Sequence, residues 1–113
     1  LWVEDRKVDI ARIANATAKL LECDLQLSPS DILSSDEYIG DRYGVLTQEG
    51  RDALKLVAET EGIFLDPVYT SKAMAGMIDQ IRKGIIRKNE TVVFIHTGGL
   101  PALFAYAEDL MLS

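Results

Sequence analysis

The sequence predicts an α/β fold, with a partial layer of parallel sheet flanked by helices. Helix-like and strand-like segments alternate along the second half of the chain, which is the pattern of parallel α/β proteins. The segment TVVFIH, residues 91–96, is an unbroken apolar and β-branched run, as expected for a strand that is covered on both faces. Two strand-like segments make a poor sheet alone, because both would be edges. The chain therefore needs further strands from elsewhere.

Helices are predicted where apolar residues recur at helical spacing between recognisable end signals. Thr47 is a suitable N-cap, while Gly62 and Gly84 are natural C-terminal stops. The expected helices cover residues 8–22, 47–61 and 71–83, and a fourth begins near Gly99 or Leu100.

Two further segments connect these helices. GIFLD, residues 62–66, is predicted as a short strand that ends at Asp66 because Pro67 has no amide hydrogen to donate. Residues 28–44 are rich in Ser, Asp, Gly and Pro and are predicted to be irregular, with room for a short strand at 32–33. Long irregular connections are uncommon unless they serve a function or are disordered.

Composition narrows the functional class. The 113 residues are 48% hydrophobic and 27% charged, which is ordinary for a soluble globular domain. A net charge of −6, with scattered basic residues, disfavours a nucleic-acid partner, and no apolar run approaches the roughly 20 residues that cross a membrane. The single cysteine, Cys23, has no disulfide or metal-ligand neighbour, so we expect a reduced, cytoplasmic environment and an apolar packing role for it.

Candidate site residues follow the two predicted strands. Ligands of parallel α/β proteins collect at the carboxyl ends of the strands, which here lead into LDPVYTSKA and HTGGLPA. The paired glycines of HTGG either let backbone amides approach an anion or serve a tight turn, and the sequence favours neither. His96 is expected to be a hydrogen-bonded structural residue, and no second histidine or cysteine lies near it to share a metal.

The hydroxyl groups near these loops allow two interpretations each. Tyr69 either anchors its loop or offers a hydroxyl to a carboxylate, and Tyr43 is likewise an anchor or a pocket hydroxyl. Thr70 or Ser71 is expected to cap the following helix, and Lys72 to be a solvated charge. The spacing of these residues alone names no reaction.

Two longer stretches carry a family resemblance. RYGVLTQEGRDALKLVAETEGIFLDPVYTSKAMAGMIDQIRKG and VVFIHTGGLPALFAY resemble the C-terminal part of the D-cysteine desulfhydrase and 1-aminocyclopropane-1-carboxylate (ACC) deaminase family. These are pyridoxal-phosphate enzymes with the tryptophan synthase β-like fold. The resemblance extends from about Tyr38 to Tyr106, and residues 1–113 would form the C-terminal part of the large domain.

The resemblance implies a role for each matching residue. Tyr43 and Tyr69 would face the substrate, a small amino acid. Thr70 would lie beside the pyridine nitrogen of the cofactor, and the cofactor ring would be lined by Thr97, Gly98 and Gly99. No metal is implied.

The same positions favour one activity within the family. Thr70 stands where ACC deaminases have glutamate, in DPVYEGK, and HTGG replaces HLGG. A desulfhydrase, which converts D-cysteine to pyruvate, sulfide and ammonia, is therefore preferred to an ACC deaminase, which yields 2-oxobutyrate and ammonia. Ser71, where glycine is usual, and Leu100, where a smaller residue is commoner, depart from the family pattern.

The Schiff-base lysine and the glycine-rich phosphate loop of the family belong upstream of Leu1. This resemblance implies a longer enzyme, the parent chain, of which residues 1–113 are an inactive fragment. The expected partners are a small amino-acid substrate and further copies of the chain, with no nucleic acid and no membrane. A different class of function, a non-catalytic interaction module, remains the alternative if no such lysine precedes these residues.

Overall fold

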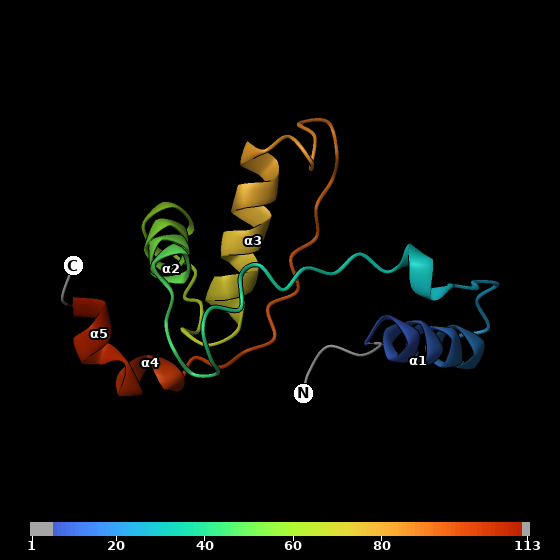
Figure 1. The fold of residues 1–113 in the computed structure, drawn as a ribbon, viewed down its shortest axis with the longest axis horizontal. Helices are drawn as coiled ribbons and strands as arrows, with labels where there is room; N and C mark the ends of the chain where they lie inside the picture. The colour runs from blue at the N-terminus through green and yellow to red at the C-terminus, as the bar shows by residue number, and fades with distance from the viewer. Residues whose placement is uncertain (1–5, 112–113) are drawn as a thin grey trace. The chain divides into compact units, whose positions relative to one another are not determined.

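The computed structural model describes residues 6–111, which form two compact units. The first unit ends at Ser35, and the second begins at Asp36. The elements in chain order are α1 (Arg6–Leu20), the 3₁₀ turn η1 (Pro29–Asp31), α2 (Gln48–Glu61), α3 (Thr70–Arg82), α4 (Ala102–Ala105) and α5 (Ala107–Met111) (Figure 1).

The first unit is built from α1 and the segment that follows it. The side-chain amide of Asn15 donates to the carbonyl of Leu27 at 2.8 Å and accepts from its N–H at 2.7 Å, which clamps residue 27 to the helix. Ala11 and Ala18 are the buried residues of α1, whereas Ile13 and Leu20 of its apolar stripe are exposed. The predicted helix is confirmed, but its apolar stripe stays largely in solvent.

Two expectations in the first unit are wrong. Residues 29–31 form a 3₁₀ turn, and no strand follows at 32–33. Cys23 is exposed and does not pack in a core, because the chain turns sharply at Glu22, whose φ is 54°.

The core of the second unit lies between α2 and α3, which pack against each other. Its buried members are Ala53, Val57, Leu65, Met74 and Ala75. Gly50 lets the two helices approach closely, because a Cβ there would lie 3.3 Å from Ser71 Oγ and 3.0 Å from Thr47 Oγ1.

The end signals of the second-unit helices are confirmed. Thr47 Oγ1 accepts the N–H of Gly50 at 3.0 Å, as an N-cap should. Gly62, with φ 66°, ends α2 in the left-handed conformation and donates to the carbonyl of Ala58. The last predicted helix is present but divided at Tyr106 into α4 and α5.

The described residues do not show the predicted sheet layer. Within residues 6–111 the structure has no strand, and no backbone hydrogen bond joins 62–66 to 91–96. Side chains connect the two segments, and one of them, Phe94, packs against the core cluster that includes Leu65. Val93 and Ile95, on either side of it, are 81% and 77% exposed. A β-strand requires a neighbouring strand that exchanges backbone hydrogen bonds with it along its length. Neither segment has such a neighbour among the described residues.

None of the helices within residues 6–111 has the length and apolar content that a bilayer crossing requires.

Candidate active site

Asp66 organises the start of α3. Its side chain is fully buried, and Oδ2 accepts the N–H groups of Val68 and Tyr69, each at 2.8 Å. Oδ1 accepts the N–H of Thr70 at 2.7 Å and the Thr70 hydroxyl at 2.7 Å. The first N–H groups of a helix have no partner within the helix, so this carboxylate supplies what the helix lacks.

The expectation that Thr70 or Ser71 caps α3 is therefore wrong. The N-cap position is Tyr69, whose side chain makes no capping bond, and the capping group comes from Asp66, three residues earlier. Ser71 is fully buried, and its Oγ has no hydrogen-bond partner among the described residues. The hydroxyl that matters at this turn is that of Thr70, which is 2% exposed.

The carboxylate network sets the ionisation of Asp66. Burial alone would raise the pKa of Asp66, but the hydrogen bonds from Thr70, Tyr69 and Val68 together hold it below the ordinary value of 3.8. A carboxyl group whose pKa is lower in the folded state stabilises the fold above its unfolded pKa. That contribution is lost as the pH falls through the folded pKa.

This linkage predicts how an Asp66→Asn variant responds to acid. At pH 7 the variant should unfold at lower urea concentration than the wild type, because its amide cannot accept from all four donors. The difference should shrink below pH 3.8, the ordinary value, as the wild-type carboxylate itself becomes protonated. Urea unfolding of both parent chains from pH 7 to pH 3 measures this difference in stability. A difference that stays constant over this range would contradict the lowered pKa of Asp66.

The two tyrosines that the resemblance implicates lie together. The hydroxyls of Tyr43 and Tyr69 share a hydrogen bond, and their ring centroids are 5.9 Å apart at an interplanar angle of 58°. Both side chains are exposed, Tyr43 by 79% and Tyr69 by 56%. Tyr106 holds the loop that carries Tyr43, because its hydroxyl donates to the carbonyl of Gly44.

This pairing has a chemical consequence. The hydrogen bond that Tyr69 shares with Tyr43, together with partial desolvation, favours the protonated form of Tyr69 and raises its pKa, so Tyr69 keeps its proton at neutral pH. Of the two hydroxyl protons, one is used between the rings, and the other remains free for a ligand. The pair can thus donate one proton to an anionic group.

The HTGG turn lies against Asp66. The N–H of Gly98 donates to His96 Nδ1 at 3.0 Å, so Nε2 carries the ring proton and donates to the carbonyl of Phe64 at 2.8 Å. This arrangement agrees with the structural role expected for His96, and it joins the ends of the two predicted strand segments. Thr97 is exposed on the same turn.

The paired glycines are both left-handed, with φ 91° at Gly98 and 93° at Gly99. A Cβ at residue 99 would lie 2.8 Å from Asp66 Cβ and Cγ, whereas a Cβ at residue 98 would meet nothing within 4 Å. Gly99 is therefore needed for close approach to Asp66, while Gly98 leaves bare backbone beside open space. The turn given by the sequence as one alternative is present, whereas approach of an anion to the glycine amides stays a prediction.

Lys72 is not the solvated charge that its position predicted. It is 8% exposed, and its ammonium group donates to the carbonyl of Ile39 at 2.6 Å. It thereby ties the first turn of α3 to the loop that also carries Tyr43. Sequence reasoning missed this contact and the role of Asp66.

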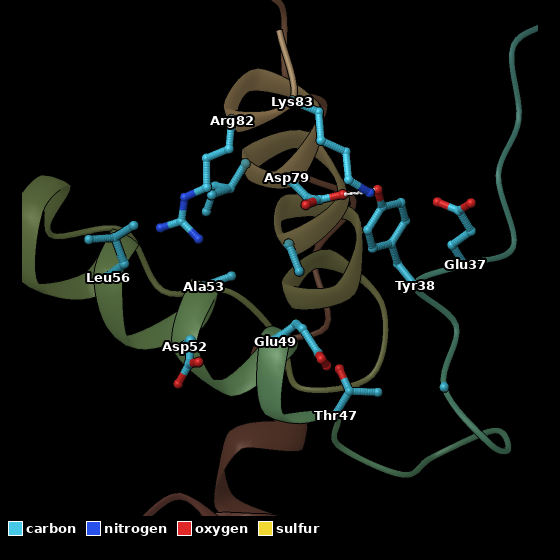
Figure 2. Close-up of a pocket in the computed structure, with 13 residues that line it drawn as sticks. Glu37, Tyr38, Thr47, Glu49, Asp52, Ala53, Leu56, Asp79, Arg82 and Lys83 are labelled. Atoms are coloured by element: carbon cyan, nitrogen blue, oxygen red, sulfur yellow. Dashed lines mark hydrogen bonds and ion pairs between the residues drawn. The ribbon is translucent and has the colours of Figure 1, made fainter. Parts of the chain in front are cut away.

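A cavity of about 410 Å³ opens between α2, α3 and the segment that carries Tyr38 (Figure 2). None of the predicted site residues lines it. Asp79 lies between Tyr38 and Lys83: its Oδ2 accepts the tyrosine hydroxyl and binds the ammonium group at 2.6 Å. These bonds to Lys83 and Tyr38 lower the pKa of Asp79, and the bond to Asp79 raises that of Tyr38. Because Asp79 and Lys83 pair with one another, we assign the cavity no ligand.

The ring of Tyr38 explains a glycine within α3. A Cβ on Gly76 would lie 2.9 Å from Tyr38 Cδ2. Alanine inside a helix is normally about 1 kcal/mol more stable than glycine. We expect Gly76→Ala instead to lower the free energy of unfolding by about 1 kcal/mol, because the tyrosine ring must move. In a Tyr38→Ala background the same change should be stabilising, and urea unfolding of the four variants shows whether the sign reverses.

Comparison with known proteins places these loops in a family. Residues 2–98 match the family described as pyridoxal-phosphate dependent enzyme. The chain belongs to this family. A crystal structure of an ACC deaminase homologue is 35% identical in sequence, with a TM-score of 0.71 over 92% of the chain. The match spans 30% of that homologue, so residues 1–113 correspond to less than a third of its length.

Membership in the pyridoxal-phosphate dependent enzyme family supports a tryptophan synthase β-like fold and pyridoxal phosphate as the cofactor. The described residues fit the ring end of such a cofactor. Gly98 offers backbone with no side chain, and Thr70 and Tyr69 each offer a hydroxyl group. The residues 6–111 hold no group of three His, Cys, Asp or Glu side chains placed to bind a metal.

Proposed function

We propose that the parent chain is a D-cysteine desulfhydrase-like lyase, to which residues 1–113 contribute the substrate tyrosines and the pyridine-side hydroxyl. The observation that carries the proposal is the Thr70 hydroxyl at the start of α3, where ACC deaminases of the resembling family have glutamate. A neutral hydroxyl there leaves the cofactor a weaker electron sink than a carboxylate would.

In the proposed reaction D-cysteine and water give pyruvate, hydrogen sulfide and ammonia. Pyridoxal phosphate, when bound, supplies the electron sink for the pair left when the substrate Cα–H bond breaks. Tyr43 and Tyr69 orient the substrate and hold the single free proton of their pair. Tyr69, whose pKa is raised, is protonated at neutral pH, and the hydroxyl proton of the pair that is not shared between the rings can pass to the departing thiolate.

The proposal assigns the cofactor ring to Thr70, Thr97, Gly98 and Gly99, with the attachment lysine and the phosphate loop upstream. Lys72 is unsuited to covalent attachment, because it is buried and bonded to Ile39. The parent chain would act on a small amino acid as a cytoplasmic homo-oligomer.

An ACC deaminase is the second candidate, favoured by the likeness to a deaminase homologue at 35% identity. It would combine ACC and water to give 2-oxobutyrate and ammonia. The Tyr43–Tyr69 pair suits either substrate, because each has an α-carboxylate that accepts a hydroxyl proton.

The two candidates are separated by product analysis of the parent chain loaded with pyridoxal phosphate. Sulfide and pyruvate from D-cysteine, without 2-oxobutyrate from ACC, would support the desulfhydrase. Release of 2-oxobutyrate would contradict the argument from Thr70. Tyr69→Phe should lower kcat by about 10²-fold or more, as expected for loss of a proton donor. Tyr38→Phe, which removes a hydroxyl outside the site, should leave kcat unchanged.

A further inference from the structure

The hydroxyl of Thr70 makes two hydrogen bonds, both to Asp66. Its oxygen accepts the backbone N–H of Asp66 at 2.8 Å, and its proton goes to Oδ1 of the same residue at 2.7 Å. A threonine hydroxyl has one proton and two lone pairs. The proton of the Thr70 hydroxyl is donated to Asp66, and one lone pair accepts the Asp66 N–H. The second lone pair of the oxygen remains for a ligand.

The direction of this hydrogen bond follows from charge. The three backbone N–H groups that donate to the carboxylate keep Asp66 ionised despite its burial, so Oδ1 is a charged acceptor. Hydrogen bonds to an ionised acceptor are roughly twice as strong as those between neutral groups. An unprotonated pyridine nitrogen is a neutral acceptor and would compete poorly for the proton of Thr70.

We propose that Asp66 is a positioning residue that holds the Thr70 proton, so that Thr70 presents an oxygen lone pair, not a hydroxyl proton, to the pyridine nitrogen. This inference rests on the proposed placement of Thr70 beside the cofactor. A lone pair is complementary to a protonated ring nitrogen. Asp66 thus favours the protonated form of the ring nitrogen through its bond to Thr70, without contacting the ring itself. The cofactor would then be a stronger electron sink than a lone hydroxyl implies.

The contact with Gly99 supports this role of Asp66. The glycine backbone closes over the side chain, and a Cβ there would lie 3.1 Å from Oδ1, the oxygen that receives the Thr70 proton. The HTGG turn therefore restricts Asp66 to the conformation in which it bonds Thr70. Both loops that the resemblance places around the cofactor ring meet at this carboxylate.

The test uses the parent chain loaded with pyridoxal phosphate that carries ¹⁵N at the ring nitrogen. The ¹⁵N chemical shift at pH 7 reports whether this nitrogen is protonated, independently of turnover. The wild type and Thr70→Ser, which keeps the hydroxyl, are expected to show a protonated ring. Thr70→Val, which removes the hydroxyl at nearly the same shape, should show an unprotonated ring and a dissociation constant for the cofactor about tenfold higher.

Asp66→Asn gives the decisive comparison, because its amide can donate to Thr70 and turn the hydroxyl proton toward the ring. We expect the ring nitrogen to lose its proton in this variant. An unprotonated ring in the wild type, or an unchanged shift in Thr70→Val, would overturn the inference even if Asp66→Asn does not fold. A parent chain that does not bind pyridoxal phosphate would overturn the proposed function as well. Sulfide release with an unprotonated wild-type ring would overturn the inference alone.

Discussion

Replacing Asp66 by alanine is expected to lower the free energy of unfolding of the parent chain by about 4 kcal/mol, near the upper end for a single substitution. The carboxylate accepts three backbone N–H groups and one hydroxyl at a fully buried position. Each buried donor left without an acceptor costs about 1–3 kcal/mol, and partial entry of water reduces the sum.

The measurement is urea unfolding at pH 7, with Asp52→Ala as the matched control. Asp52 also accepts a side-chain hydrogen bond, from Gln48 at 2.8 Å, but it lies on an exposed surface of α2. Asp52→Ala should lower the free energy of unfolding by no more than about 0.5 kcal/mol. Hydrogen exchange of the peptide containing residues 66–78 should also accelerate in Asp66→Ala. Equal effects of the two variants would show that Asp66 does not hold the turn.

Gly99→Ala is expected to be more destabilising than Gly98→Ala, although the two backbones differ in φ by only 2° (91° and 93°). Each alanine incurs left-handed strain of about 1–2 kcal/mol. At residue 99 the new methyl group also overlaps the buried Asp66 side chain, which should add about 2 kcal/mol.

Because the strain is matched, the difference between the two variants isolates the contact with Asp66. Urea midpoints of the parent chain give this difference. Circular dichroism in the aromatic region should change more for Gly99→Ala, since displacement of Asp66 loosens Tyr69. If the two alanines cost the same, the glycine pair serves only the turn.

Local signals were enough to predict the helices. Thr47, Gly62 and the apolar spacing of α2 and α3 act within a few residues, and the predicted boundaries lie close to those observed. The predicted sheet is not seen within the described residues, because strand pairing depends on partners that local sequence does not specify. TVVFIH has the composition of a buried strand, yet within the described residues it has no neighbouring strand.

The candidate site was predicted in part. The resemblance selected Tyr43 and Tyr69, which lie 26 positions apart, and the structure brings their hydroxyls together. Their roles, and those of Thr70, Thr97, Gly98 and Gly99, stay predictions. Asp66 was interpreted only as the end of a strand. An aspartate shortly before a helix start is itself a capping signal, and it could have been recognised from the sequence.

The buried amine of Lys72 has a consequence for chemical labelling. The other lysines, at positions 7, 19, 55, 83 and 88, are exposed, whereas Lys72 is enclosed and bonded to Ile39. Amine-reactive reagents, including aldehydes in excess, should therefore modify those five positions and spare Lys72 while α3 is folded. Acylation of Lys72 then reports local opening of the 37–40 loop. This residue can serve as an internal reporter that distinguishes adventitious surface adducts from loss of structure around the site.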